Sequence, residues 1–491
     1  MIAFQPEFRP ALPFVFGAKE YNDRRSVLEE IDRILVTSGL EGDFISRHIS
    51  PDSKGLSKGK GQSSCRMVQR ALRYTILLAL TEESYRELSL RVADSLLFQW
   101  FTSSAQIDGV RPASKSTIER YSKMFSREEI MWLIHELNRA VSDDKGAAEL
   151  LLRQTRVRFD QIFADTTCVK ANIHFPVDWV LLRDAVRTLI KAIEVIRSHG
   201  LKYRISEPTE FLRKMNKLCI EMSSVRKKKN ASKMRKVIFR RMKKLAKTVQ
   251  KHGENYHREL EARWSETDLS QVEARVILER IENILSQLPQ AIKQAHERII
   301  GGRRVKNEDK ILSFYEPEVH VIVRGKAGAE VEFGNSLYMA EQMDGLIVDL
   351  LLMEEQPPGD NKLVQGSVER IEQEYGEISS YAADRAFDSP QNRIDLEKLE
   401  IINAICPRSV PLLQEKLEDD EFRLLQKRRG ATEGRIAIFK NCFLGRPLRS
   451  KGFINRQLRV ELCVLAHNLW KLGSMAAERR KELQRESAKA A

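Results

Sequence analysis

Segments typical of strands and of helices alternate between residues 318 and 407, and this alternation constrains the fold more than any other feature. Three strand-like runs, VHVIV, EVEFGNSLYMA and GLIVDLLLM, come first. They are followed by a helix, a strand that ends at Asp384, a second helix and a further strand, IINAIC. This order indicates a mixed α/β sheet rather than an all-helical or all-β domain.

One more strand is expected at residues 156–169, where RVRFDQIFADTTCV has strand-like apolar positions. Residues 180–310, which follow it, have helical spacing and no strand signal. If the early strand joins the later ones, the helical stretch is an insertion that leaves the sheet and returns to it. We therefore predict a mixed sheet formed by residues 156–180 and 311–475, with a helical insertion at 181–310.

The insertion contains the most basic stretch of the chain. Residues 226–251 hold 13 Lys or Arg and no Asp or Glu, and apolar residues keep helical spacing through the run. The whole chain carries 83 Lys+Arg against 69 Asp+Glu, a net charge of +14, which suits nucleic acid or an anionic membrane surface. We expect a helix with a buried face and a DNA-binding cationic face, although a solvated charged face has the same pattern. The candidate DNA contacts are Lys227, Lys228, Arg235, Arg240 and Lys243.

Residues 61–155 are expected to form an all-helical DNA-binding domain. Ser84 with Glu87 and Ser116 with Glu119 have the spacing of capping boxes that open helices. Two helices joined by a loop fit a helix-turn-helix, but another helical bundle would have the same pattern. The candidate DNA contacts in the second of these helices are Lys115 and Arg120.

The ends of the chain and its cysteines indicate a cytoplasmic protein. Residues 1–60 are expected to be an N-terminal arm and linker, with a flexible run SKGLSKGKGQSS, and residues 476–491 a charged tail. The six cysteines show no CxxC and no zinc spacing, which favours free thiols in a reducing compartment. The apolar runs are too short to span a bilayer, and MIAFQPEFRP does not have the pattern of a signal peptide.

The stretch QKRRGATEGRIAIFK, residues 426–440, carries charges at helical spacing. Arg429, Glu433 and Lys440 are four and then seven residues apart, about one and two turns, so a helix would place them on one face. Taken alone, this pattern fits a solvated amphipathic helix with an ion pair. A carboxylate between two cations also suits phosphate chemistry, provided that other carboxylates meet it.

Two further carboxylates are expected to meet Glu433 at the sheet. Asp165 and Asp384 each lie at the end of an apolar strand, where an acid is costly unless it is paired, hydrogen-bonded or bound to metal. Strand ends and the following helices line one edge of an α/β sheet, so the three side chains can converge there. A ligand set made only of carboxylate oxygens suits two Mg²⁺ or Mn²⁺ ions, which are used in phosphodiester chemistry. Arg429 and Lys440 would then hold DNA phosphates.

At these residues the chain resembles bacterial insertion-sequence transposases with an RNase H-like DDE catalytic domain. The run FADTTCVKANIHFPVD is similar to the strand that carries the family's first catalytic Asp, and AADRAFDSPQNR to the block that carries the second. The third motif in one large subgroup is Y-(2)-R-(3)-E-(6)-K. Arg429, Glu433 and Lys440 match its last three positions.

The likeness covers residues 155–180 and 310–472, with a weaker similarity at 84–125. Gln426 stands where the subgroup has Tyr, and Ala386 stands where Gly is common. Neither departure removes a metal ligand.

The resemblance implies a DNA transposase with an RNase H-like domain, whose mixed α/β sheet is expected to have five strands. Such an enzyme binds the terminal inverted repeats of its element, cleaves DNA and joins the 3′-hydroxyl ends to target DNA by two-metal phosphoryl transfer. Asp165, Asp384 and Glu433 would be its catalytic metal ligands. The implied partners are double-stranded DNA, as transposon ends and target, and a second copy of the chain in a homodimer on DNA.

Two other functions are compatible with the same residues. An RNase H-like metal-dependent nuclease would have the same carboxylates and perform no strand transfer. An inactive transposase-derived protein would bind DNA without cleaving it, although three intact carboxylates argue against decay. We interpret Asp388 as a neighbour of a helix N-cap and His174 as structural, and we assign no nucleophilic role to Cys168.

Overall fold

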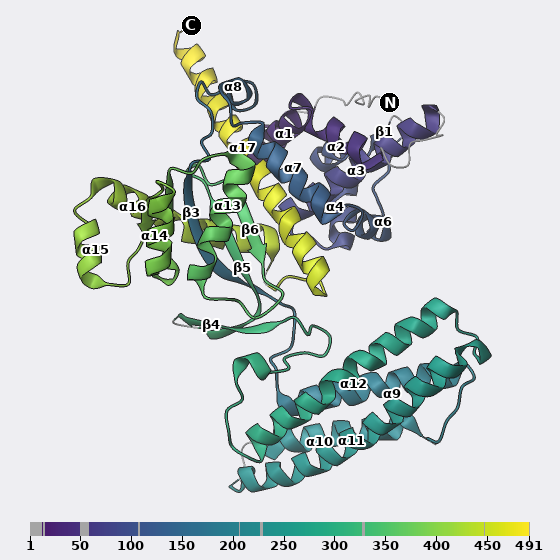
Figure 1. Cartoon of the computed structure of the whole chain (residues 1–491). Coiled ribbons are helices and arrows are strands. Elements are labelled where there is room, and N and C mark those ends of the chain that lie inside the picture. Colours follow the sequence, from purple (N-terminus) through teal and green to yellow (C-terminus); the bar gives the residue numbers. More distant parts are fainter. Residues whose placement is uncertain are drawn as a thin grey trace.

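The molecule has three parts: a helical N-terminal part, a sheet with its covering helices, and a separate bundle of long helices (Figure 1). The fold is mixed α/β, as the alternation of strands and helices predicts. The computed structural model describes residue 12 and residues 15–49, 58–106, 109–205, 207–225, 229–326, 329–445 and 447–490.

The central sheet has six strands in these described ranges, one for each strand-like segment of the sequence and one more than the five that the resemblance implies. Their order is β4-β5-β3-β7-β8, and β6 also pairs with β5. β3 is antiparallel to β5 and parallel to β7, so the sheet is mixed. The sixth strand is accommodated because the outer edge of the long β5 pairs with β4 at one end and with β6 at the other. The strands are β3 (Gln161–Lys170), β4 (His320–Lys326), β5 (Ala329–Glu341), β6 (Ile347–Leu352), β7 (Ser380–Ala383) and β8 (Ile402–Ile405).

One face of the sheet is covered by helix α16. Phe163, Ala382 and Ala404 come from three neighbouring strands and are buried on this face. They pack against Phe422 and Leu425, which lie three residues apart on α16 and therefore on the same side of the helix. The helices that follow the antiparallel strands are α13 (Val364–Tyr375), α14 (Pro390–Lys398), α15 (Val410–Lys416) and α16 (Asp420–Phe439).

The opposite face of the sheet is covered by α13. The hydroxyl of Tyr338 on β5 donates to Ser367 of α13 at 2.6 Å and lies 2.7 Å from the hydroxyl of Tyr381 on β7. All three side chains are buried, so these hydrogen bonds satisfy polar groups that would otherwise be costly inside the protein. The sheet is therefore the middle layer between α13 and α16.

The N-terminal part is a cluster of helices that also includes the C-terminal helix. A two-stranded ladder of β1 (Ala105–Gln106) and β2 (Gly109–Val110) is the exception to its predicted all-helical character. The long α17 (Phe453–Ala490) packs against α1, α3 and α7. The other helices are α1 (Lys19–Thr37), α2 (Leu40–Ile49), α3 (Lys58–Thr81), α4 (Tyr85–Asp94), α5 (Leu96–Phe101), α6 (Lys115–Tyr121), α7 (Arg127–Arg139) and α8 (Asp144–Leu151).

Helix α17 also joins this cluster to the sheet. Asn468 is fully buried, accepts a hydrogen bond from the backbone N–H of Ile347 at 3.0 Å and donates to its C=O at 2.8 Å. The amide side chain thus pairs with the outer edge of β6 in the way that a further strand would. Asn138 of α7 donates to the same carbonyl at 3.2 Å.

Three local predictions are wrong, and one prediction of the same kind is confirmed. The capping box of Ser84 and Glu87 is present at the start of α4. Helix α6, however, is capped by Ser114, whose side chain accepts from the N–H of Thr117, and not by Ser116. Part of the predicted linker is helical, because α3 begins at Lys58 and continues into a strongly buried apolar face.

The third error concerns residues 476–491, which continue α17 as a helix to Ala490 rather than forming a tail. Arg480 and Lys481 pair with acids of α1, which accounts for the charge of this segment. Most of the predicted arm, residues 1–11, and the linker residues 50–57 lie outside the described residues.

The insertion is a bundle of four long helices, which confirms its predicted helical character. In Figure 1 the bundle lies below the sheet and is joined to it by two segments. It has a hydrophobic core of its own, to which all four helices contribute. Its helices are α9 (Asp178–Ser198), α10 (Pro208–Ser224), α11 (Ala231–Arg263) and α12 (Gln271–Ile299). No helix within the described ranges is long and apolar enough to span a membrane.

Candidate active site

Asp165 and Asp384 occupy neighbouring positions at the centre of the sheet. In the parallel ladder of β3 and β7, Phe163 pairs with Ala382. Each aspartate lies two residues further along its chain, so both side chains point to the face that α16 covers. Asp384 directly follows β7, and its Oδ1 accepts a hydrogen bond from the N–H of Ala386 at 2.8 Å. The two carboxylates are therefore side by side. The prediction that a strand ends at Asp165 is wrong, because β3 continues to Lys170 through its pairing with β5.

The pKa of Asp165 shows which charges surround it. It is raised to about 6, first by burial and second by the negative charge of Asp384. A smaller rise comes from Glu433, whereas the N–H of Thr166 and the charge of Arg429 lower the pKa. Three carboxylates and one guanidinium group that lie far apart in the sequence thus interact at one place.

Gln426, in the first half of α16, attaches this helix to the sheet. Its side-chain amide donates to the backbone carbonyls of Ala383, at 3.1 Å, and of Ala404, the ends of β7 and β8. Its carbonyl oxygen accepts from Nε of Arg429 at 3.2 Å. The residue that replaces the expected Tyr therefore orients Arg429 and holds the helix against the strand that precedes Asp384.

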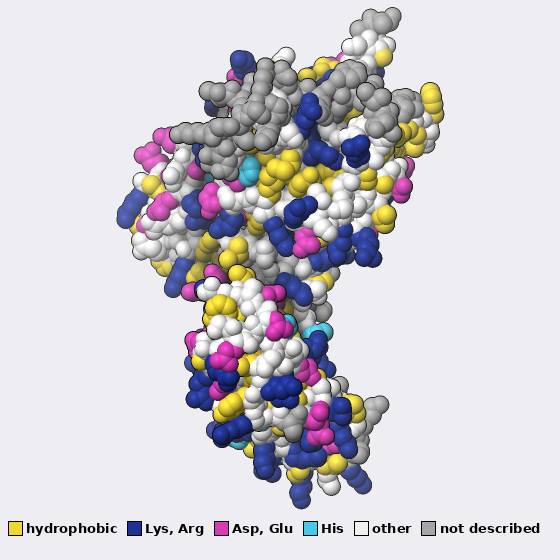
Figure 2. All heavy atoms as spheres, turned by 90° about the vertical axis from the view of Figure 1, so that its right-hand side faces the viewer, with side chains coloured by type: hydrophobic (Ala, Val, Ile, Leu, Met, Phe, Trp, Pro, Cys, Tyr) yellow, Lys and Arg dark blue, Asp and Glu magenta, His cyan; other side chains and the backbone are white. Residues whose placement is uncertain are grey.

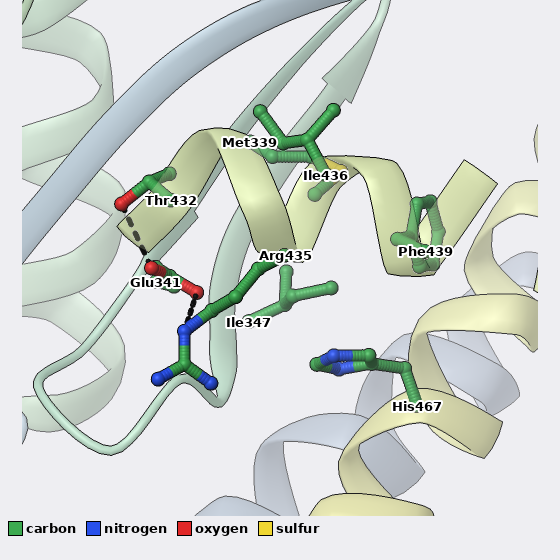
Figure 3. Close-up of a pocket in the computed structure, with 8 residues that line it drawn as sticks. All are labelled: Met339, Glu341, Ile347, Thr432, Arg435, Ile436, Phe439 and His467. Atoms are coloured by element: carbon green, nitrogen blue, oxygen red, sulfur yellow. Dashed lines mark hydrogen bonds and ion pairs between the residues drawn. The ribbon is translucent and has the colours of Figure 1, made fainter. Parts of the chain in front are cut away.

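A second attachment of α16 is Glu341, the last residue of β5 (Figure 3). This side chain is 4% exposed and accepts a hydrogen bond from Thr432 at 2.8 Å. It also pairs with Arg428 at 2.9 Å and with Arg435 at 3.2 Å. Gly345 leaves room for Arg435, since a Cβ on Gly345 would lie 1.9 Å from its Nη1. Sequence reasoning missed Glu341, although an acid at the end of the apolar run SLYMAE is the same signal that identified Asp165 and Asp384.

Lys440 is the third attachment, and its predicted role as a DNA contact does not agree with its position. It begins a π-helical turn, Lys440–Leu444, directly after α16. The side chain is 8% exposed, and its Nζ donates to the hydroxyl of Thr167 on β3 at 3.0 Å. Because the ammonium group lies inside the protein, we interpret Lys440 as a residue that positions α16.

Glu433 is held between these attachments and remains exposed. Thr432 and Arg435, which contact Glu341, lie on either side of it in the sequence. The neighbouring Arg429 has a buried Nη1 that makes no hydrogen bond within the described residues. A buried N–H donor without a partner next to a carboxylate cluster is suited to an oxygen atom of a ligand.

The donor chemistry of the site fits a hard divalent cation. Asp165 interacts electrostatically with two other carboxylates, and carboxylate oxygens are the ligands that Mg²⁺ and Mn²⁺ prefer. A cation would also relieve the repulsion that raises the pKa of Asp165. As the side chains stand, no three His, Cys, Asp or Glu residues in the described ranges form a closed ligand set. Glu433 would have to turn toward the two aspartates to complete one.

The predicted DNA contacts outside α16 lie in two separate parts of the molecule. Lys115 and Arg120 are exposed on α6 of the N-terminal part, and Arg240 is exposed and Lys243 half-buried on α11 of the bundle. Arg235 packs over the ring of Trp179 at 4.9 Å. Lys227 and Lys228 lie outside the described residues.

The buried face predicted for α11 is present at Ile238 and Met242, whereas Met234 is exposed. Figure 2 shows that Lys and Arg side chains are numerous on the bundle and that Asp and Glu lie among them. Glu221 of α10 pairs with Arg241 at 3.1 Å. The cationic face of α11 is therefore partly neutralised by its neighbours in the bundle.

Three other residues stay outside the site. Asp388 accepts two hydrogen bonds from Arg393, at 2.9 and 2.7 Å, and precedes Ser389, the N-cap of α14. His174 is exposed in the segment after β3, and Cys168 is buried in β3 itself.

No protein-family model, curated protein or solved structure matches this chain. Its site is therefore interpreted from the geometry of its own residues and from its motifs.

Proposed function

We propose that the chain is a DNA transposase in which Asp165, Asp384 and Glu433 are the catalytic metal ligands of an RNase H-like domain. The observation that carries the proposal is the pairing of β3 with β7, which places Asp165 beside Asp384 on the face that is covered by α16, the helix of Glu433. A mixed sheet between α13 and α16 supports the assignment of an RNase H-like domain. The spacing of Arg429, Glu433 and Lys440 agrees with it, since all three act on side chains of β3.

The three carboxylates would hold two Mg²⁺ or Mn²⁺ ions, which would supply Lewis-acid stabilisation for phosphodiester cleavage and for attack by a 3′-hydroxyl. The chain's own residues prepare the site for this role. Burial and Asp384 make an isolated charge on Asp165 costly, so the pair favours a bound cation. Arg429 offers its unpaired Nη1 to a phosphate oxygen next to the carboxylates. Gln426 and Glu341 keep α16, and with it Glu433, at the sheet.

Binding of double-stranded DNA is assigned to the basic residues on the two flanking parts. Lys115 and Arg120 on α6 would contact one stretch of a transposon end, and Arg240 and Lys243 on α11 another. Phosphate contacts of this kind position a duplex and make binding dependent on salt. Two ends have to be cut for one transposition event, so we propose that a homodimer forms on DNA.

The test of this proposal is metal-dependent cleavage by a Glu433→Gln variant. The DNA substrate is a linear fragment that carries the sequences flanking the gene, and the cofactor is Mg²⁺ or Mn²⁺. Gln keeps the size of the side chain but removes its negative charge. We expect cleavage to fall at least about 1,000-fold, as for other residues that are essential to an active site. Binding of the same fragment should change less than about twofold, because Glu433 contributes no cation to phosphate binding.

The matched control is Glu421→Gln, which makes the same change at an exposed position in the first turn of the same helix. This variant should cleave at the wild-type rate. Wild-type cleavage by Glu433→Gln, or equal losses in both variants, would show that the active site is assigned wrongly.

A further inference from the structure

A cavity of about 440 Å³ lies where the bundle joins the sheet. Its walls are the segment between β3 and α9, residues of α9, Arg280 of α12, the segment before β4 and the loop before α17. These include both of the segments that connect the bundle to the sheet (Figure 1). We call this cavity the junction cleft. Four exposed cations line it: Arg187, Lys191, Arg280 and Lys451.

The acids of the junction cleft do not neutralise these cations. Asp184 is buried and pairs with Arg183 at 2.9 Å. Glu316 is buried and pairs with Arg456 at 2.6 Å, and its second contact is the backbone N–H of Gly452 at 3.0 Å. None of the four lining cations forms an ion pair with another residue of the described chain. The cleft is therefore a local excess of positive charge, which suits a polyanion.

Two aromatic rings at the same cleft are open to solvent. Phe175 is 73% exposed and lies in a T-shaped contact with Phe333, at 5.5 Å between ring centres, so most of its ring is open to solvent. Tyr315 is 49% exposed, and its hydroxyl is held 2.7 Å from that of Thr188. Exposed rings beside unpaired cations are the combination that binds single-stranded nucleic acid, where bases stack on the rings and cations follow the backbone.

We propose that the junction cleft binds single-stranded DNA. The bases of a duplex are stacked on one another and cannot reach the face of Phe175, whereas unpaired bases can. This inference rests on the proposed function, because it assumes that the substrate is DNA. It adds a site for an unpaired strand to the duplex contacts on α6 and α11.

The cleft is placed to receive a strand that leaves the active site. β3 carries Asp165 and runs on to Lys170, and the chain then enters the wall of the cleft at Asn172. At about 3.3 Å per residue, Asn172 is about 23 Å from Asp165 along this strand. Lys451 is also part of the wall of the cleft. It lies in the loop before α17, whose Leu448 pairs with the chain directly after β3. A strand that is separated near Asp165 can thus follow β3 into the cleft.

The test measures the affinity of the full-length protein for a fluorescent oligonucleotide and for its duplex, by anisotropy without divalent cations. The oligonucleotide should be longer than the roughly 4–16 nucleotides that a single-strand site covers. Phe175→Ala should weaken single-strand binding by about 5- to 140-fold, since a stacked base contributes about 1–3 kcal/mol. Lys191→Glu should weaken it as well and reduce its salt dependence by about 0.7 per lost phosphate contact. Duplex affinity should change less than about twofold in both variants.

The control is Lys217→Glu, the same charge change at an exposed position of α10 outside the cleft. It should leave both affinities unchanged. Wild-type single-strand binding by Phe175→Ala and Lys191→Glu would refute the inference, and so would an equal loss of duplex binding, which would indicate a duplex backbone site. Thermal unfolding followed by circular dichroism checks that the variants fold, as expected for exposed residues. Cleavage by Glu433→Gln refutes only the proposed active site, whereas unchanged single-strand binding in the cleft variants refutes only this site.

Discussion

Replacing Glu341 by Gln should loosen α16 and displace Glu433. The carboxylate of Glu341 is buried and pairs with the guanidinium groups of Arg428 and Arg435. Gln has the same shape and can still accept the hydrogen bond from Thr432. Its amide is neutral, however, so two cations lose their counter-charge. Breaking a buried ion pair in this way typically costs about 3–5 kcal/mol.

The expected loss is smaller here because both cations keep other partners. Arg428 also donates to the carbonyls of Met343, at 2.8 Å, and Gln342, at 2.9 Å. The side chain of Arg435 is 25% exposed, so water can solvate part of its charge. We therefore expect the free energy of unfolding of Glu341→Gln to fall by about 2–3 kcal/mol. Urea unfolding followed by circular dichroism measures this change.

The same variant should also lose cleavage at temperatures where it is fully folded. A misplacement of about 1 Å at a reacting group costs about 100-fold in rate, and Glu433 lies on the part of α16 that Glu341 holds. Glu377→Gln, at an exposed position before β7, is the control and should change neither property. The reasoning is refuted if Glu341→Gln loses less than about 0.5 kcal/mol, the size of an ordinary surface effect, and cleaves at the wild-type rate.

Two further predictions concern buried charge in the helical part. Arg73→Met should lower the free energy of unfolding by about 3–5 kcal/mol, because Glu41 and Asp32 would lose the buried guanidinium group that both contact. A urea midpoint equal to that of the wild type would contradict this prediction. Burial lowers the pKa of His467 from 6.5 to about 4, so the unfolded chain binds the extra proton first as the pH falls. Stability should therefore decrease between about pH 6.5 and pH 4, by up to about 3 kcal/mol, and urea unfolding of His467→Phe should lack this part of the decrease.

The order of strands and helices was predictable because apolar periodicity is a local property. The strand at Asp165, the strand that ends at Asp384 and the helix of Glu433 all follow from spacing within a few residues. The helical insertion between the first strand and the others follows in the same way. The pairing of the strands was not predictable, since the outer edge of β5 is shared between β4 and β6.

The attachments of α16 could not be predicted, because they depend on residues that meet only in the folded chain. Glu341 lies 91 residues before Thr432, and Lys440 lies 273 residues after its partner Thr167. The motif has Tyr at the position of Gln426, so it says nothing about the role of a Gln there. The hydrogen bonds of Gln426 to β7 and β8 form only once the strands are paired. The charges of residues 476–491 likewise indicated a tail, because their partners on α1 are distant in sequence.

The most direct test of the proposed function is a strand-transfer assay with a pre-cut end. The wild-type protein, Mg²⁺ and a DNA fragment with an exposed 3′-hydroxyl at the end of the element are incubated with target DNA. We predict a joined product with the wild type and none with Glu433→Gln. Cleavage of the uncut fragment without any joined product would contradict the transposase and indicate a metal-dependent nuclease.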